Sequence, residues 1–271
     1  MNETAIIDLH THTINSPDGN HEALFMAETA ANNKIHTVAF TDHCEVDYFY
    51  KDNYDKVVEN SFRDVSKVCE ELKGKINILK GVELAQPHYN TELAEKIINT
   101  YDYDVVIGSI HNLREQEDFY FWKTFDGIDI EATMNEYFDE LIQMLQWGNF
   151  EILAHITYPF RYIYNLCGYV EDINKYKNKV DELLKLCAEK DKALEINMGG
   201  LKYPINKPSP DLDTVKRYKE LGGRLVSVGS DSHYAERIGV NIDKAYDIAR
   251  EAGFKSVATF KNRKVSEFAI V

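Results

Sequence analysis

The sequence has few cysteines, no excess of basic residues and no long hydrophobic run. Its four cysteines are Cys44, Cys69, Cys167 and Cys187, and no two of them form a CxxC pair. Because the start of the chain does not resemble a secretory leader, we expect a cytoplasmic protein with reduced thiols. No apolar run approaches the roughly 18 residues that a membrane-spanning helix needs, so no membrane partner is expected.

The shortage of basic residues also bears on the partner. The chain has 45 acidic residues against 31 lysines and arginines, a net charge of −14. Proteins that bind nucleic acids usually present a basic face, so a nucleic acid is not expected as the main partner. A small anionic substrate stays open, because bound metal ions can reverse the sign of the charge locally.

The pattern along the chain favours a single α/β domain over residues 1–271. It contains no linker, low-complexity tract or repeat of 20–50 residues. Short apolar, β-branched runs alternate with longer segments of helical spacing, which is typical of a parallel sheet or barrel. The strands are predicted at 5–9, 36–41, 76–83, 104–110, 151–156, 193–197 and 225–229, and the helices near 22–33, 55–73, 91–99, 129–147, 172–190, 210–221 and 242–252.

Histidines and carboxylates follow six of these seven predicted strands. In parallel barrels the carboxyl ends of the strands open on one face, where active sites lie. Any one of these residues alone is more typical of a hydrogen-bonded structural residue, but their repetition predicts a metal site. Only the sixth strand, ending in Glu195-Ile196-Asn197, has no candidate ligand. The candidates on the other strands are His10, His12, Asp42, His43, Glu83, His111, His155, Asp231 and His233.

The chemistry of these residues narrows the choice of metal. Imidazole mixed with carboxylate suits Zn, Fe or Mn. Cys44 directly follows His43, so its side chain should face the other way, and we interpret it as a packed thiol rather than a ligand.

The motifs, in this order, resemble those of the polymerase-and-histidinol-phosphatase (PHP) superfamily. The chain is most similar to its histidinol-phosphatase branch, through Ser16-Pro17-Asp18-Gly19, the segment Gly108-Ser109-Ile110-His111 and a length near 270. The resemblance covers nearly the whole chain. It implies a distorted seven-stranded (β/α)7 barrel with the metal site at the carboxyl ends of the strands.

The resemblance also implies three divalent metal ions (Zn, Fe or Mn) with Glu83 bridging the first two. Asp18 is the least typical of the ligands, and a plain turn residue is the alternative for it. The first ion would be bound by His10, His12, Glu83 and Asp231, the second by Glu83, His111 and His155, and the third by Asp18, His43 and His233.

Two further aspartates adjoin these motifs. Asp8 is expected to accept a hydrogen bond from a ligand imidazole, although a carboxylate satisfied by backbone amides is the alternative. Asp42 is predicted, with Glu83, to be catalytic. Asp42 and a metal-bound water are the candidates for the general acid, and the sequence does not decide between them.

Three divalent ions contribute a charge of about +6 and three ligand carboxylates about −3, so a phosphate dianion would be attracted to the site. We expect in-line attack of a metal-bridging hydroxide on a phosphomonoester. The resemblance places substrate-binding basic side chains at Arg161 and Lys202, whereas the alternative for each is a solvated surface charge. The aromatic stretch Phe119–Trp122 is expected to cover the pocket or to anchor a loop.

The function that the resemblance implies is hydrolysis of L-histidinol phosphate to L-histidinol and phosphate, in histidine biosynthesis. The first alternative is a PHP phosphoesterase acting on another small phosphate, such as a nucleotide or sugar phosphate. The second is a metal-binding module without catalysis, which the complete ligand set disfavours. The expected partner is a small-molecule phosphate, and the sequence leaves the oligomeric state open.

Overall fold

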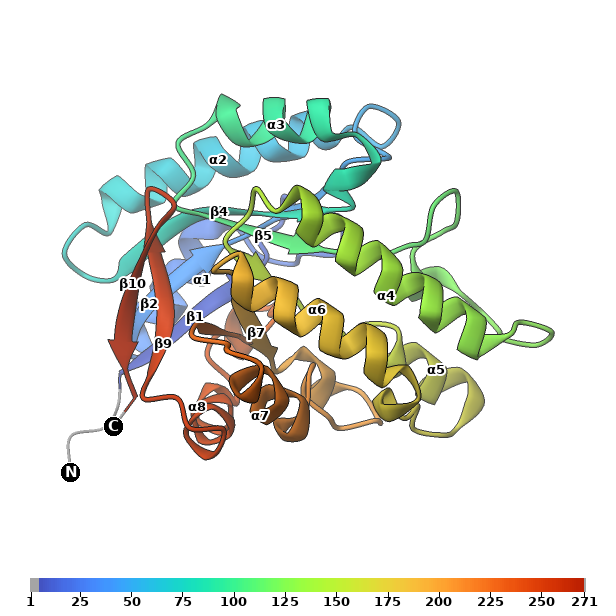
Figure 1. Ribbon diagram of the computed structural model, residues 1–271. Helices are drawn as coiled ribbons and strands as arrows, with labels where there is room; N and C mark the ends of the chain where they lie inside the picture. The colour runs from blue at the N-terminus through green and yellow to red at the C-terminus, as the bar shows by residue number, and fades with distance from the viewer. Residues whose placement is uncertain (1–4, 271) are drawn as a thin grey trace.

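Short β-branched runs form a parallel barrel at the centre of the protein (Figure 1). The computed structural model describes residues 5–270. Its main sheet has the order β1-β2-β4-β5-β6-β7-β8, with the short β3 beside β4. The strands are β1 (Ile6–Thr11), β2 (Ile35–Phe40), β3 (His43–Glu45), β4 (Asn77–Ala85), β5 (Val105–Ser109), β6 (Ile152–Leu153), β7 (Ala193–Asn197), β8 (Val226–Gly229), β9 (Ser256–Lys261) and β10 (Lys264–Ala269).

The two edge strands of this sheet, β1 and β8, lie next to each other. The backbone N–H of Asp231 donates to the carbonyl of His10 at 2.9 Å, and that of His12 donates to the carbonyl of Ser232 at 2.8 Å. These bonds bring the segment after β8 against the end of β1, so the barrel is nearly closed. The predicted seven-stranded barrel is confirmed, and closure places the first and last motifs side by side.

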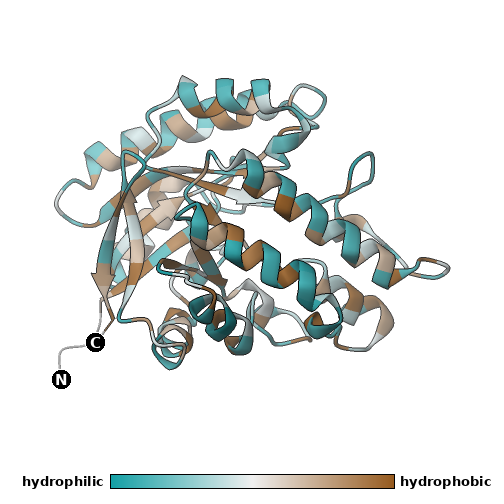
Figure 2. Cartoon of the chain, viewed as in Figure 1, coloured by the Kyte–Doolittle hydropathy of each residue, from teal (hydrophilic) through white to brown (hydrophobic). Residues whose placement is uncertain are grey.

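Eight α-helices and five short 3₁₀ helices surround the strands within residues 5–270. Figure 2 shows hydrophilic and hydrophobic residues mixed along them, as expected of helices that cover a core with one face. The α-helices are α1 (Ala23–Asn32), α2 (Tyr54–Glu71), α3 (Thr91–Thr100), α4 (Ile130–Trp147), α5 (Phe160–Cys167), α6 (Lys177–Glu189), α7 (Leu212–Glu220) and α8 (Ile242–Glu251). The 3₁₀ helices are η1 (Pro87–Tyr89), η2 (Phe119–Phe121), η3 (Ile173–Tyr176), η4 (Gly199–Lys202) and η5 (Ala235–Arg237).

Helix α4 illustrates how local sequence sets these elements. Its N-cap Asp129 accepts a hydrogen bond from the backbone N–H of Ala132 at 3.0 Å, and it ends at Gly148, whose φ of 67° suits glycine. Tyr137 and Leu141, spaced four residues apart, are both buried. Burying a side chain such as Leu141 stabilises the fold by roughly 1.5–3 kcal/mol, which holds α4 against the barrel.

The sequence analysis missed the β9–β10 hairpin. Its two turn residues, Asn262 and Arg263, both have positive φ, as a tight two-residue hairpin turn requires, but arginine is an unusual residue there. Ala258 and Phe260 of β9 pack with buried side chains of the barrel strands, including Leu9 and Leu79. Figure 1 shows the hairpin at one end of the barrel, away from α5, so it closes the end opposite the polar strand termini.

Two other departures concern the region after the fourth predicted helix. The fifth predicted strand, 151–156, is reduced to the two residues of β6, because the chain turns at His155, whose carbonyl accepts from the N–H of Tyr158 at 2.8 Å. The unpredicted helix α5 follows at once, entered through Pro159 and ended by Gly168 with φ of 77°. Within residues 5–270, no helix is both long and apolar enough to cross a bilayer.

Candidate metal centre

The carboxyl ends of the barrel strands bring the predicted ligands together around Glu83 of β4. This carboxylate is completely buried. Its Oε2 lies 3.3 Å from His10 Nε2 and 3.6 Å from His12 Nε2. Its Oε1 lies 3.1 Å from His111 Nε2 and 2.9 Å from His155 Nε2. The two oxygens of Glu83 therefore face two different groups of imidazoles, the arrangement that a bridging carboxylate needs.

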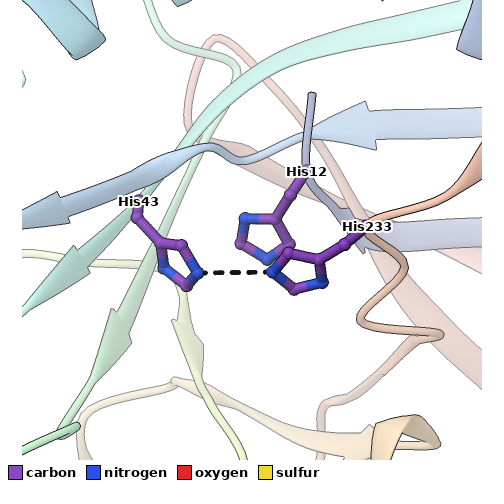
Figure 3. A group of neighbouring side chains, drawn as sticks. All are labelled: His12, His43 and His233. Atoms are coloured by element: carbon purple, nitrogen blue, oxygen red, sulfur yellow. Dashed lines mark hydrogen bonds between the residues drawn. The ribbon is translucent and has the colours of Figure 1, made fainter. Parts of the chain in front are cut away.

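A third group lies beside the first. Asp18 Oδ1 is 3.5 Å from His43 Nε2, and Asp18 Oδ2 is 3.1 Å from His233 Nε2. Figure 3 shows His43 and His233 with their ring nitrogens turned toward each other, 3.4 Å apart. His12 stacks on both rings, with centroid distances of 4.2 Å to His43 and 4.1 Å to His233. Asp18 is 49% exposed, so this group is the outermost of the three.

The boundaries between the groups are less sharp than the resemblance implies. His12 can share an ion with His10 and Glu83, or with His43 and His233, because in each set the donor atoms lie within 4.8 Å of one another. His12 Nε2 is also 3.6 Å from Asp231 Oδ1. His43 Nδ1 approaches Glu83 Oε2 to 2.8 Å, so His43 also stands between two groups.

Several of the buried atoms that face one another here meet without the geometry of a hydrogen bond. These atoms include His10 Nε2, His12 Nε2, His43 Nδ1 and Glu83 Oε2. Leaving one buried polar atom unpaired costs about 1–3 kcal/mol, so several at one place call for a ligand. Divalent cations would satisfy all of them at once, and the residues present therefore fit the expected metals. The N and O donors suit Zn, Fe or Mn.

The electrostatics of the site agree with cation binding. Burial raises the pKa of Glu83, but the imidazoles of His111, His10 and His43 outweigh burial and hold this pKa well below its usual value. Burial lowers the pKa of His10, but the carboxylates of Glu195 and Glu83 outweigh burial and raise this pKa well above its usual value. Both directions show that the site favours positive charge, which divalent ions would supply.

His12 differs from the other histidines at the centre of the site. Burial, followed by the neighbouring imidazoles of His233 and His43, holds its pKa well below the usual value. Its ring is therefore neutral near pH 7, with a lone pair available for a metal. Cys44 is buried, and burial raises the pKa of its thiol well above the usual value. This agrees with its interpretation as a packed thiol.

Asp8 does not contact an imidazole, so the first expectation for it is wrong and the alternative holds. Its carboxylate accepts from the N–H of Ser230 at 2.9 Å, from the N–H of Gly239 at 2.8 Å and from the Ser230 hydroxyl. It therefore fastens β1 to the segment after β8, at the closing point of the barrel.

Asp42 is also fully engaged. Its oxygens accept from the N–H of Thr13 at 2.6 Å, from the Thr13 hydroxyl at 2.7 Å, and from the hydroxyls of Ser16 and Ser61. It is buried and is not among the residues that line the cavity described below. This geometry favours a supporting role for Asp42 over the predicted catalytic one.

Two buried glutamates behind the ligands were missed. Glu195 Oε1 is 2.7 Å from His10 Nδ1, and Glu45 Oε1 is 2.8 Å from His111 Nδ1. Carboxylates in this position fix the tautomer of a metal-binding imidazole. A signal existed in each case: Glu45 stands two residues after His43, and Glu195 interrupts the apolar strand β7.

A cavity of about 310 Å³ opens over the metal-binding groups. Arg161 and Lys202 both line it, as the resemblance implies. Arg161 is only 4% exposed, so the surface-charge alternative is wrong for this residue. Its Nη1 lies 3.6 Å from Asp231 Oδ2, whereas Nη2 has no hydrogen-bond partner. Lys202 is exposed at the cavity rim, where its Nζ lies 5.4 Å from the ring centre of Tyr203.

The aromatic stretch after His111 fulfils both of its expected roles. Phe119 is fully buried and packs on Trp122, with ring centroids 4.8 Å apart. Tyr120 and Phe121 are about half exposed, and both line the cavity. The stretch therefore anchors a loop through Phe119 and presents two aromatic rings to the cavity.

Comparison with known proteins gives consistent matches. Residues 8–199 match the family model of the PHP domain. The chain is 29% identical to the probable histidinol-phosphatase of Clostridium acetobutylicum, over 97% of this chain and all of that protein. It is 27% identical to the histidinol-phosphatase of Lactococcus lactis subsp. lactis, over 96% of each. A crystal structure of the L. lactis histidinol phosphate phosphatase, complexed with zinc, L-histidinol and phosphate, superposes with a TM-score of 0.79 at 25% identity and covers 97% of this chain.

Proposed function

The chain belongs to the PHP domain family, and on that premise we propose that it is a metal-dependent phosphatase that hydrolyses L-histidinol phosphate to L-histidinol and phosphate. The main support for the proposal is a single cavity. It is lined both by predicted ligands with unpartnered atoms, such as His43 and Glu83, and by the buried guanidinium of Arg161, whose Nη2 has no hydrogen-bond partner. The chain acts as a single domain on a small molecule in the cytoplasm. Its four cysteines, all free thiols, are consistent with that compartment.

The residues assigned to the ions are those around Glu83. His10, His12, Glu83 and Asp231 would hold the first divalent ion, Glu83, His111 and His155 the second, and Asp18, His43 and His233 the third. When bound, such ions lower the pKa of coordinated water and neutralise charge that develops on phosphoryl oxygens.

The protein's own contribution begins with the phosphate. Arg161 packs against the rings of Tyr158 and Tyr203, with its guanidinium carbon 4.9 and 5.3 Å from their centres. This packing pre-orients the guanidinium, whose unpaired Nη2–H can donate to a phosphate oxygen. Lys202 adds a more mobile charge at the rim. Asp42 holds Thr13 and Ser16 in the loop that carries Asp18, and we assign it this positioning role.

The lining of the cavity suits a cationic leaving group. Besides Glu45, which already accepts from His111, it includes Asp52, Glu117 and Asp118, together with tyrosine rings. Histidinol carries an ammonium group and an imidazole ring, which carboxylates and aromatic faces can bind. Asp118 Oδ1 accepts from the hydroxyl of Tyr158 at 2.9 Å and from the N–H of Tyr120 at 2.8 Å, which leaves Oδ2 for a ligand. The same acidic lining disfavours nucleotides, whose leaving groups carry no compensating cation.

A substrate panel tests this proposal. The metal-loaded protein is assayed for phosphate release from histidinol phosphate, a sugar phosphate, a nucleoside monophosphate and phenyl phosphate. We expect the highest kcat/KM for histidinol phosphate. Clear turnover of another ester with none of histidinol phosphate would refute the substrate assignment. Absence of turnover for every ester would refute the enzymatic assignment as a whole.

Substitution of a bridging ligand provides the matched control. Glu83→Gln should abolish phosphate release and lower the bound metal. Glu140→Gln alters another buried glutamate beside a histidine, His88, outside the cavity, and should leave both properties unchanged.

A further inference from the structure

Glu195 is a buried carboxylate that contacts predicted ligands of two different metal ions, His10 and His155. Its Oε1 accepts from His10 Nδ1–H at 2.7 Å. Its Oε2 accepts from the backbone N–H of His155 at 2.9 Å and from Asn197 Nδ2 at 3.2 Å. His10 and His155 in turn face opposite oxygens of Glu83, at 3.3 and 2.9 Å. Glu195 is therefore linked to both sides of the bridging carboxylate.

These contacts distinguish a supporting residue from a ligand. Glu195, His10 and His155 lie close enough to hold an ion among themselves. However, both oxygens of Glu195 already accept hydrogen bonds, and Glu195 is not among the cavity-lining residues. The His10 nitrogen without a hydrogen-bond partner is Nε2, on the Glu83 side of the ring. The ring can thus bind an ion through Nε2 while Nδ1–H stays with Glu195.

Gly229 of the neighbouring strand β8 leaves the space that this pairing needs. A Cβ atom at Gly229 of β8 would lie 2.5 Å from Glu195 Oε1 and 2.5 Å from the Cβ of His10. Contacts this short are not tolerated, so an alanine at this position would force the Glu195 carboxylate, the His10 side chain or both to shift. The pairing therefore depends on three segments that come together only where the barrel closes: β7, β8 and β1.

We propose that Glu195 is a positioning residue that couples the first two metal sites, by fixing the Nδ1–H tautomer of His10 and by holding the backbone that carries His155. The coupling rests on the proposed metal centre. It predicts that loss of this one carboxylate weakens ion binding on both sides of Glu83, although Glu195 binds no ion itself. Loss of such a supporting partner typically lowers metal affinity by about 10- to 100-fold.

The test compares Glu195→Gln and Glu195→Asp with wild type and with Glu140→Gln, the matched buried glutamate. Each protein is loaded with zinc, and the number of ions per chain and the rate of zinc transfer to a chelator are measured. We expect Glu195→Gln to bind as many ions as wild type at saturating zinc. Two of these ions should leave at least tenfold faster, whereas Glu140→Gln should match wild type. Glu195→Asp, which keeps the charge, should lie between them.

Two results would overturn the coupling. One is zinc release from Glu195→Gln at the wild-type rate. The other is a wild-type protein that binds one more ion than Glu195→Gln at saturation, which would make Glu195 a ligand. Gly229→Ala gives a second route, since it should accelerate release of the same two ions with Glu195 intact. A wild-type protein that binds no zinc would refute the proposed metal centre itself. That result differs from failure of the coupling alone, in which wild type still binds zinc.

Discussion

Arg161 offers the sharpest test of how this site binds phosphate, because a second basic residue lines the same cavity in a different setting. Arg161 is buried, whereas Lys202 is exposed. The perturbation is to replace each by methionine, which keeps an unbranched side chain and removes the charge. Arg161→Lys, a third variant, keeps the charge but loses the planar fork of the guanidinium.

The structure sets the expected magnitudes. The Nη2 of Arg161 is buried with no hydrogen-bond partner, so a phosphate oxygen would receive a charge-assisted bond there without displacing a protein partner. Such a bond contributes about 1.5–3 kcal/mol, which corresponds to about a 10- to 100-fold loss of kcat/KM in Arg161→Met. The exposed Lys202 interacts through solvent, and its removal should lower kcat/KM by about two- to fivefold. Arg161→Lys should lie between these values.

The assay is the initial rate of histidinol phosphate hydrolysis at low and high salt. Salt screens exposed charges over about 10 Å at 0.1 M, so the effect of Lys202→Met should shrink as salt is added. The effect of Arg161→Met should persist. Equal losses in the two methionine variants, or an Arg161 effect that salt removes, would refute the reasoning.

One control is essential, because Arg161 Nη1 also lies 3.6 Å from Asp231 Oδ2. Burial raises the pKa of Asp231, but Lys202, His10, His233 and Arg161 outweigh burial and hold that pKa well below its usual value. Removing the guanidinium could therefore disturb a predicted metal ligand. Lys202 acts on the same carboxylate, so the metal content and unfolding midpoint of both Arg161→Met and Lys202→Met must match wild type before either kinetic loss is assigned to phosphate binding.

Three other predictions follow from individual carboxylates. Burial raises the pKa of Asp118 to about 6, so the KM for histidinol phosphate should rise as the pH falls below 6. Asp118→Asn should raise this KM at every pH. An equal change in the KM for phenyl phosphate would contradict the assignment. Asp42→Asn should lower the free energy of unfolding by about 2 kcal/mol or more in urea titrations, because each carboxylate oxygen accepts two hydrogen bonds, from Thr13 and Ser16 or from Thr13 and Ser61, and the amide nitrogen that replaces one oxygen cannot accept any. An unchanged midpoint would refute the supporting role. Asp18→Ala should reduce the zinc content from three ions to two, because Asp18 is the most exposed of the predicted ligands. Elemental analysis after dialysis measures this content. Retention of three ions would favour the interpretation of Asp18 as a plain turn residue.

Much of the candidate metal centre could be predicted because its residues follow local rules. His10 lies in β1 and His12 follows one residue after its end, so the two side chains, two positions apart, point to the same side and their ring centroids lie 5.0 Å apart. Glu83 lies within β4, and His111 and His155 stand just beyond the ends of strands in a parallel sheet. Parallel topology brings such strand ends to one face, and the order of the motifs in the sequence is then enough to assemble the site.

The supporting residues could not be predicted in the same way. Asp8 stands two residues before His10, yet its carboxylate bonds to Ser230 and Gly239, more than 220 positions away. The β9–β10 hairpin closes one end of the barrel, although its turn has an arginine that no turn rule favours.

The sequence by itself determined which residues can bind metal, since side-chain chemistry and strand alternation are local properties. Only the tertiary structure decided which donor faces which oxygen of Glu83 and which carboxylate stands behind each imidazole. Glu195 meets His10 across 185 residues, and the pair fits only because Gly229 leaves space beside it. Such contacts depend on barrel closure and on packing at atomic distances, and no pattern along a single strand contains that information.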